Sequence, residues 1–253
     1  MNYRKSEYLE LPHGNTIIWR YMNHSKLQRM INDSSIYFAN ANILTDKYEV
    51  SIPASTYKNQ KKLLEKSGFK GRELEEELFR FYWETNPMKN LVLINCWSVN
   101  PFESYALWKI YLGGEKNGIA IKSTVSKLRK AIEKGKDNYP EDFFISKVKY
   151  KKHLNSDELS RFTVISTKKP FYDFEKELRI FILNYPRSEG GTNPPYDLSK
   201  GRNVRVDLDI LVHEIYISPF SDTKYKEEIR KLFSNKNFIN ERFIIKESEI
   251  RDI

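Results

Sequence analysis

FEKELRIFILN at residues 174–184 joins a charged beginning to the most hydrophobic strand pattern in the second half of the chain. Glu175, Glu177 and Arg179 alternate in it, so a β-strand would place all three side chains on one face of a sheet. When two carboxylates lie this close, the pKa of one of them rises unless a cation or a ligand hydroxyl binds them and offsets their charge. Arg179 can offset the negative charge of the two carboxylates only in part. We therefore expect a functional site at the beginning of a buried strand.

Strands and helices are interspersed on both sides of this segment. Alternating or continuous short apolar runs predict strands, and apolar residues three and four positions apart predict helices. The expected strands are 16–22, 34–40, 90–98, 117–123, 147–152, 174–184, 203–208, 213–218 and 241–246. The expected helices are 24–33, 71–85, 101–112, 124–134, 156–167 and 221–234. Because the regular alternation and glycine-rich first turn of a doubly wound nucleotide-binding fold are missing, the expected class is α+β.

Two segments are expected to be loops. Residues 41–59 show a weak pattern and contain Asp46 and Glu49, so we expect a functional loop there. Residues 186–202 are rich in proline and glycine and are expected to form a flexible loop. The chain has no internal repeat and no low-complexity tract. It is therefore expected to be a single domain over residues 1–253, with a mixed or mainly antiparallel split sheet flanked by helices.

Composition narrows the range of partners and compartments. The 253-residue chain is 40% hydrophobic, which suffices for a buried core. Its 43 Lys and Arg exceed its 34 Asp and Glu, and the formal charge of +9 suits a nucleic acid or polyphosphate partner. Cys96 is the only cysteine, which excludes a disulfide within the chain and a cysteine zinc cluster. With no long apolar stretch and no signal peptide pattern, we expect a cytoplasmic protein without a membrane partner.

Common catalytic motifs are missing from the sequence. It contains no phosphate-binding glycine loop, dinucleotide fingerprint, metalloprotease helix or nucleophile elbow. Cys96 lies in an apolar run, which favours a buried structural thiol over a catalytic thiolate. The four histidines are far apart, so no metal site is expected from them. Asp46, Glu49, Glu175 and Glu177 could converge on a divalent metal, which keeps a nuclease open.

Two further patches combine polar and aromatic residues at regular spacing. In the strand segment 19–21, Arg20 stands between two aromatic residues and faces opposite to them. The alternative interpretation is a solvated charge on an edge strand. Ser104, Trp108 and Tyr111 fall at positions i, i+4 and i+7, which places them on one helix face. The alternative for this face is core packing.

Taken in order, these patches resemble an uncharacterised bacterial family, domain of unknown function 2971. The family pattern has an aromatic-Arg-Tyr strand, a strand ending in Tyr-Phe, an Asn-Asp-Pro-Phe-Glu loop, a Cys-aromatic-Ser segment, a Met-Trp-x-x-Tyr helix, a Gly-x-x-Ile strand and a Glu-x-Glu-x-Arg strand. The similar segments here are Trp19-Arg20-Tyr21, Ile36-Tyr37-Phe38, Thr45-Asp46-Lys47-Tyr48-Glu49, Cys96-Trp97-Ser98, Ser104 to Tyr111, Gly118-Ile119-Ala120-Ile121 and Glu175 to Arg179. The chain departs from the family pattern at three positions. The loop at 45–49 lacks the proline of the pattern, Tyr48 stands where the pattern has phenylalanine, and Leu107 stands where it has methionine. The family has no settled activity, so the resemblance implies a fold and a site position but no reaction.

The layout is also similar, more distantly, to ADP-ribosyltransferases, particularly those that modify DNA in toxin and antitoxin pairs. In that superfamily an early Arg or His holds NAD, a Ser or Tyr shapes the nicotinamide pocket and a later Glu completes the site. The resemblance implies an ADP-ribosyltransferase-like fold, NAD as substrate, and Arg20, Tyr37 and Glu177 in these roles. It also implies that Glu175 positions the acceptor and that Trp108 or Tyr111 stacks on a ring. The other expected binding residues are Tyr21, Asp46, Glu49, Ser98, Ser104 and Arg179.

The chemistry behind these roles is charge stabilisation. Cleaving the bond between nicotinamide and ribose builds positive charge on the ribose, which a fixed carboxylate stabilises. The implied partners are a nucleic acid acceptor, whose phosphates the basic surplus would attract, and an antitoxin or another protein of a phage-defence system. Three alternatives stay open: a magnesium-dependent nuclease that uses the same carboxylates, a non-enzymatic nucleotide sensor, and a structural brace in which Arg179 pairs with the glutamates.

Overall fold

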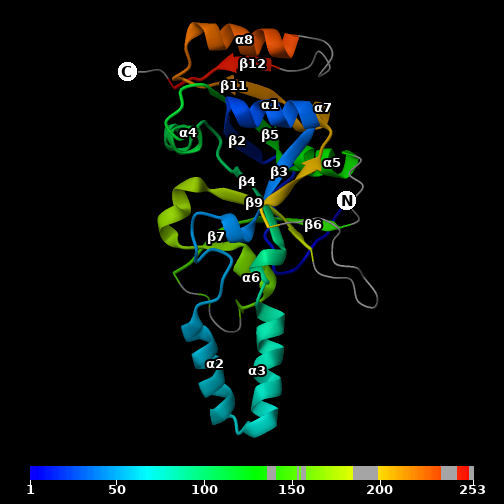
Figure 1. The fold of residues 1–253 in the computed structure, drawn as a ribbon, viewed down its shortest axis with the longest axis vertical. Coiled ribbons are helices and arrows are strands. Elements are labelled where there is room, and N and C mark those ends of the chain that lie inside the picture. The colour runs from blue at the N-terminus through cyan, green and yellow to red at the C-terminus, as the bar shows by residue number, and fades with distance from the viewer. Residues whose placement is uncertain (136–140, 153, 155–157, 185–198, 235–243, 251–253) are drawn as a thin grey trace.

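Figure 1 shows the fold as a computed structural model, which describes residues 1–135, 141–152, 154, 158–184, 199–234 and 244–250. Eight of the described strands follow one another across a sheet in the order β1 (Asn2–Tyr3), β6 (Asp142–Lys147), β9 (Glu177–Leu183), β4 (Val92–Ser98), β2 (Ile17–Asn23), β5 (Gly118–Thr124), β11 (Glu214–Ile217) and β12 (Ile244–Glu247). At β4 the sheet forks, because β3 (Ser35–Asn40) also pairs with β4 and carries β10 (Gly201–Arg205) beyond it.

The sheet is mainly antiparallel. Within it, the described pairings that are parallel join β1 to β6 and β11 to β12. The remaining described pairings of the sheet are antiparallel. A second sheet pairs the short strands β7 (Lys149–Tyr150) and β8 (Thr167–Lys168) in parallel. The predicted α+β class with a split, mainly antiparallel sheet is therefore confirmed.

Four helices cover one face of the sheet. They are α1 (His24–Asp33), α5 (Val125–Lys134), α7 (Leu208–Leu211) and α8 (Thr223–Ser234). Their apolar stripes meet alternate strand residues, as Leu27 and Ile31 of α1 and Ile180 of β9 do in one continuous core. Helix α1 ends at Ser34, whose backbone is left-handed with φ of 45°. This face carries the larger part of the core and leaves the opposite face for the polar side chains of β9.

The opposite face of the sheet has two smaller apolar clusters. Helix α4 (Tyr105–Leu112) brings Leu107 and Trp108 against Trp19 of β2 in one of them. The turn η1 (Ala41–Ile43) and helix α6 (Arg161–Ile165) contribute to the other, in which Ile165 and Phe181 of β9 take part. The charged beginning of β9 lies on this face.

A helical hairpin of α2 (Ala54–Lys66) and α3 (Gly71–Thr85) projects away from the sheet (Figure 1). It is inserted between β3 and β4, although these two strands pair side by side, with Ala39 opposite Ile94. The structure describes both helices in full. No residue of α2 is buried, and Thr85 is the one buried residue of α3.

The predictions for two segments of the first half are wrong. Helix α2 occupies part of 41–59, where a loop is expected; its sequence has weak apolar periodicity because it packs on little more than α3. The helix expected from Pro101 begins only at Tyr105. Ser104 caps it by accepting the backbone N–H of Leu107 at 3.3 Å, which fixes the first turn at that point.

Two further boundaries in the second half differ from the predictions. The strand expected at 147–152 lies earlier, as β6, because Phe143 and Ile145 alternate into the main core. Of the predicted residues, Lys147 ends β6, and Lys149 and Tyr150 form β7. Of the helix expected at 156–167, α6 forms five residues, which a capping box of Ser160 and Thr163 starts.

Strand β9 begins at Glu177, later than 174–184 predicts. The preceding η4 (Pro170–Glu175) is a 3-10 helix that ends at Lys176, a left-handed residue with φ of 45°. Glu175 is therefore not on the strand. Strand β10 lies earlier than the predicted 203–208, and α7 is an unexpected short helix.

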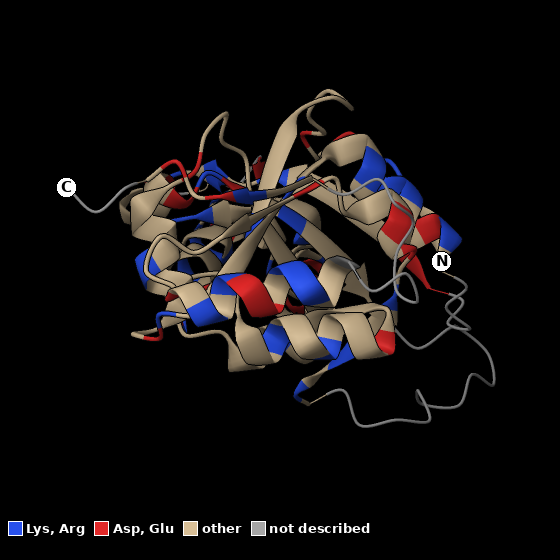
Figure 2. Cartoon of the chain, turned by 90° about the horizontal axis from the view of Figure 1, so that it is seen from above, with Lys and Arg blue, Asp and Glu red and all other residues tan. Residues whose placement is uncertain are grey.

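Some predictions fall on residues outside the described part. The expected loop 186–202 lies outside it as far as residue 198, and its last two residues already belong to β10. Residues 241–243 of the last expected strand also lie outside, before β12. None of the helices in the described ranges combines the length and apolar character that crossing a membrane requires. Lys and Arg are spread among Asp and Glu at the end of the molecule seen in Figure 2.

Candidate functional site

A charged cluster consists of Glu49, Lys168, Glu175, Glu177 and Arg179. Four segments supply it: the loop before α2, strand β8, the end of η4 and the beginning of β9. The sheet register places Glu177 opposite Ser98 of β4, which in turn pairs with Trp19 of β2. The beginning of β9 therefore lies beside the end of β4, which in turn adjoins β2.

Arg179 lies at the centre of the charged cluster, and its side chain is 0% exposed. Its Nε donates to Oε1 of Glu177 at 2.9 Å, and its Nη2 donates to Oε2 of the same carboxylate at 3.2 Å. Nη2 also donates to Glu49, and Nη1 donates to the carbonyl oxygen of Ile165. One planar guanidinium thus binds two carboxylates and one backbone carbonyl, a pattern that a lysine cannot reproduce.

Lys168 joins the three glutamates from the other side. Its Nζ lies 2.7 Å from Oε2 of Glu175, 3.1 Å from Oε2 of Glu177 and 3.6 Å from Oε1 of Glu49. The ring of Tyr172 lies 4.9 Å from the same Nζ. The glutamates raise the pKa of Lys168 in spite of its burial, so its ammonium is charged. Two cations therefore face three carboxylates.

Glu175 and Glu177 have pKa values displaced in opposite directions. Burial by itself would raise the pKa of Glu177, but Arg179 and Lys168 outweigh burial and lower it to about 2. Burial raises the pKa of Glu175; the hydrogen bond from Lys168 opposes this, and the charge of Glu177 adds to it. Glu177 is thus a permanent anion, and Glu175 is the group suited to exchange a proton.

The loop before α2 is bent to aim Glu49 at the cluster. The carboxylate of Asp46 accepts the N–H of Tyr48 at 2.9 Å, and its carbonyl accepts the N–H of Glu49 at 3.1 Å. Asp46 therefore shapes the turn. Val50 follows with φ of 56°, a left-handed conformation that β-branched residues rarely adopt. Such strain persists only where the surrounding structure fixes it, and it is typical of functional sites.

Glu175 and Glu177 are held by bonds to their backbone. The hydroxyl of Ser98 donates to the carbonyl of Glu175 at 2.7 Å, and the N–H of Val99 donates to the carbonyl of Lys176 at 2.7 Å. The N–H of Glu177 donates to the hydroxyl of Tyr150 at 2.8 Å. These bonds tie the end of β4 to the turn between η4 and β9, so the predicted residue Ser98 has a positioning role.

Tyr111 of α4 lies within electrostatic reach of this cluster, and Arg20 of β2 lies beside Tyr111. Burial raises the pKa of Tyr111, the proximity of Cys96 and of both Glu177 and Glu175 raises it further, and Arg20 lowers it. Nη1 of Arg20 donates to the carbonyl oxygen of Cys96 at 3.1 Å. The structure thus brings the predicted residue Tyr111 toward the two glutamates, with Arg20 beside Tyr111 and Cys96.

No protein-family model and no curated protein matches this chain. The resemblance to domain of unknown function 2971 and to ADP-ribosyltransferases therefore stays a prediction from the motifs.

The remaining predicted residues of α4 serve the fold. Trp108 is 0% exposed and donates from Nε1 to Oε2 of Glu103 at 2.9 Å, so it fills the core and offers no ring to a ligand. Ser104 caps the helix, and its backbone N–H donates to the hydroxyl of Tyr21 at 2.8 Å. The ring of Tyr21 packs edge-on against Trp108, with centroids 5.0 Å apart.

Tyr37 is half-exposed on β3, and its hydroxyl donates to the carbonyl of Lys200. Burial raises its pKa, and no charge of the cluster contributes to that shift. The structure therefore does not join Tyr37 to the charged cluster, whereas the predicted residue Tyr111 lies within its electrostatic reach.

Two residues of the site have no signal in the sequence. Lys168 follows α6 in a Lys-Lys pair that looks like many solvated lysines of this basic chain. Tyr150 stands between lysines in a short strand. Both reach the site because β7 pairs with β8. In this pairing Lys149 lies opposite Thr167, 18 residues later in the chain.

The carboxylates do not form a metal site. Among the residues that the structure describes, no group of three or more His, Cys, Asp or Glu side chains could hold a metal ion. The carboxylate of Asp46 is used in a turn, and Arg179 and Lys168 bind the other three. The arrangement therefore gives little support to the nuclease alternative.

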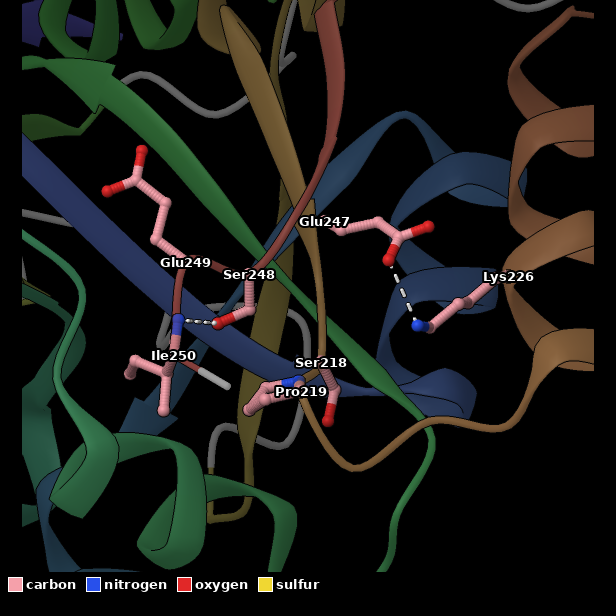
Figure 3. Close-up of a pocket in the computed structure, with 7 residues that line it drawn as sticks. All are labelled: Ser218, Pro219, Lys226, Glu247, Ser248, Glu249 and Ile250. Carbon is pink, nitrogen blue, oxygen red and sulfur yellow. Dashed lines mark hydrogen bonds and ion pairs between the residues drawn. The ribbon is translucent and has the colours of Figure 1, made fainter. Parts of the chain in front are cut away.

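A pocket of about 540 Å³ lies elsewhere, at the ends of β11 and β12 beside α8 (Figure 3). Lys226 of α8 faces Glu247 of β12 across it, with Nζ and Oε2 3.0 Å apart. Ser218, Ser248 and neighbouring residues complete its lining. No residue of the charged cluster lines this pocket, and no predicted site residue does.

Proposed function

We propose that this chain is a cytoplasmic ADP-ribosyltransferase that uses NAD as its substrate and modifies a nucleic acid or a protein. The observation that carries the proposal is the approach of Tyr111, with Arg20 beside it, to two glutamates whose pKa values are displaced in opposite directions. Such a pair separates a proton carrier from a permanent anion, which is the division of work that acid-base chemistry at neutral pH requires.

The reaction assigns one role to each glutamate. It breaks the bond between C1′ of the ribose and the nicotinamide nitrogen, and it forms a bond from C1′ to an oxygen or nitrogen of the acceptor. The electron pair of the broken bond leaves with nicotinamide, which becomes neutral, and the proton of the acceptor passes to Glu175. The buried negative charge of Glu177 stabilises the positive charge that builds up on the ribose.

The other residues fit binding roles. The guanidinium of Arg20 is suited to a phosphate of NAD, because its planar donors match phosphate oxygens. The partly exposed ring of Tyr111 offers a surface on which nicotinamide can stack. It replaces Trp108 and Tyr37 in that role. The surplus of Lys and Arg would attract the phosphates of a nucleic acid acceptor, and an antitoxin or phage-defence partner would restrain the activity.

The experiment that tests the proposal measures nicotinamide release from NAD by the purified chain, with single-stranded DNA, RNA or cell lysate as acceptor. We expect Glu175→Gln to lower release by about a hundredfold or more. The matched control is Glu214→Gln. Like Glu175, Glu214 is a glutamate that lysine binds, here Lys122 and Lys246; unlike Glu175 it is buried outside the charged cluster and its pKa is lowered to about 2. This control should retain most of the activity if it remains folded.

Other outcomes would change the assignment. Release that is unchanged in Glu175→Gln contradicts the role of that residue. Stoichiometric NAD binding without product contradicts the transferase and favours the sensor. Nucleic acid cleavage that a chelator stops, with no nicotinamide release, favours the nuclease.

A further inference from the structure

The α2–α3 hairpin exposes a group of aromatic side chains on α3. Phe79 is 67% exposed and Trp83 is 50% exposed, and their rings stack with centroids 6.4 Å apart. Tyr82 is also exposed and lies 5.6 Å from the ring of Tyr57 on α2. Three exposed aromatic residues within five positions are unusual on a surface helix, because aromatic side chains contribute most of their free energy when they are covered.

Carboxylates flank these rings on the same side of α3. Glu75 precedes Phe79 by four residues, and Glu76 precedes Trp83 by seven, so helical spacing places both on the aromatic side. Glu76 forms an ion pair with Arg72 that is largely exposed and therefore weak. In the described part of the chain, Glu75 forms no ion pair. The surface thus combines aromatic faces with available negative charge.

We propose that this surface of α3 binds a basic, apolar segment of another protein, such as an amphipathic helix with Lys or Arg beside its apolar stripe. Both kinds of group present on α3 attract cations, because the face of an aromatic ring is electronegative and a carboxylate is an anion. The apolar stripe of the partner would cover Phe79 and Trp83. Aromatic residues of this kind are the ones that dominate the binding energy of protein interfaces.

A short chain of contacts connects the aromatic surface to the charged cluster. The carbonyl of Trp83 accepts a hydrogen bond from Nη2 of Arg161, the first residue of α6, at 2.6 Å. The last residue of α6 is Ile165, whose carbonyl accepts from Arg179. A partner on α3 would therefore contact Trp83, which is bonded to the first residue of α6. The last residue of α6 is bonded to Arg179 in the charged cluster.

The test uses the full chain and two designed helical peptides labelled with a fluorophore. One peptide has leucine on one face and arginine on the other, and the second has glutamate in place of arginine. We expect fluorescence anisotropy to show binding of the arginine peptide alone. Affinity should fall about tenfold or more in the double variant Phe79→Ala with Trp83→Ala, and several-fold in Glu75→Gln.

The matched control is Phe171→Ala, which removes a ring that is 77% exposed on η4 and should leave the affinity unchanged. Because all the altered side chains on α3 are exposed, circular dichroism should show intact folding. Equal binding of both peptides, or binding that survives the double variant, contradicts the proposal. Concentration-dependent dimers that the double variant abolishes would identify a second copy as the occupant and also overturn it. The readout is binding, so its outcome is independent of NAD chemistry.

Discussion

Arg179 and Glu177 stand two residues apart on one face of β9, and Nε of the arginine donates to Oε1 of the glutamate at 2.9 Å with both side chains buried. The pair is part of a cluster in which Arg179 and Lys168 face three carboxylates. One negative charge is left over, and Glu175 is the carboxyl whose pKa is raised. The local imbalance of charge thus identifies the residue that can exchange a proton.

Replacing Arg179 by methionine should destabilise the fold strongly. The variant leaves Glu177 and Glu49 buried with Lys168 as their remaining cation, and breaking a buried pair in this way costs about 3–5 kcal/mol. Urea unfolding of both proteins measures the loss. Arg4→Met is the control, because Arg4 pairs with Asp142 at an exposed position and should contribute less than about 1 kcal/mol. Similar losses in the two variants would contradict the central role of Arg179.

Glu177 should make stability depend on pH in the acid range. Its pKa is about 2 in the folded chain against an ordinary value of 4.5, so its stabilising effect is complete above about pH 5 and is lost as the pH falls toward 2. Glu177→Gln removes this dependence. The difference in unfolding free energy between wild type and variant, roughly 3 kcal/mol at neutral pH, should therefore narrow to about half near pH 3. A difference that is constant from pH 3 to pH 7 would contradict the ion pairing.

The rate of nicotinamide release should fall on acidification because Glu175 acts as a base. A base works only when deprotonated, and the pKa of Glu175 is raised above its ordinary value of 4.5. The acid limb of kcat/KM against pH should therefore have its midpoint above 4.5. In Glu175→Gln the residual rate should lose this limb. The proposed base would be wrong if the limb persisted in that variant.

Ser34 and Ser67 offer a matched pair of substitutions at helix ends. Ser34 ends α1 with φ of 45°, which glycine adopts without strain, whereas Ser67 ends α2 with φ of −79°. Ser34→Gly should raise the free energy of unfolding by about 0.5–1 kcal/mol. Ser67→Gly should lower it by a similar amount, since glycine adds freedom to the unfolded chain. Thermal unfolding of the two variants checks the opposite signs.

Elements with a strong local pattern could be predicted from the sequence. Helices α1, α3 and α5 and strands β2, β4 and β5 lie within a few residues of the predicted positions, because their apolar residues recur at the period of the element that buries them. The sequence does not predict helix α2, because none of its residues is buried. Without a buried face, its apolar residues do not recur at the helical period.

The candidate site was predictable only in part. Alternation in FEKELRI indicated that Glu177 and Arg179 share a face, and the strand confirms it. The same pattern placed Glu175 on the strand, where a left-handed Lys176 in fact ends a 3-10 helix. Lys168 could not be found at all, because its role depends on strand pairing between distant segments.

The bond between Arg179 and Glu49 joins residues 130 positions apart in the chain. During synthesis from the N-terminus, Glu49 leaves the ribosome long before Arg179 exists, and the loop that carries it has no cation of β9 to bind. Helices can form from neighbouring residues, but the charge balance of the site needs Glu49 and Arg179 together. A nascent or truncated chain that stops before β9 would therefore lack the strand that joins β4 to β6, and Glu49 would have no Arg179 to bind.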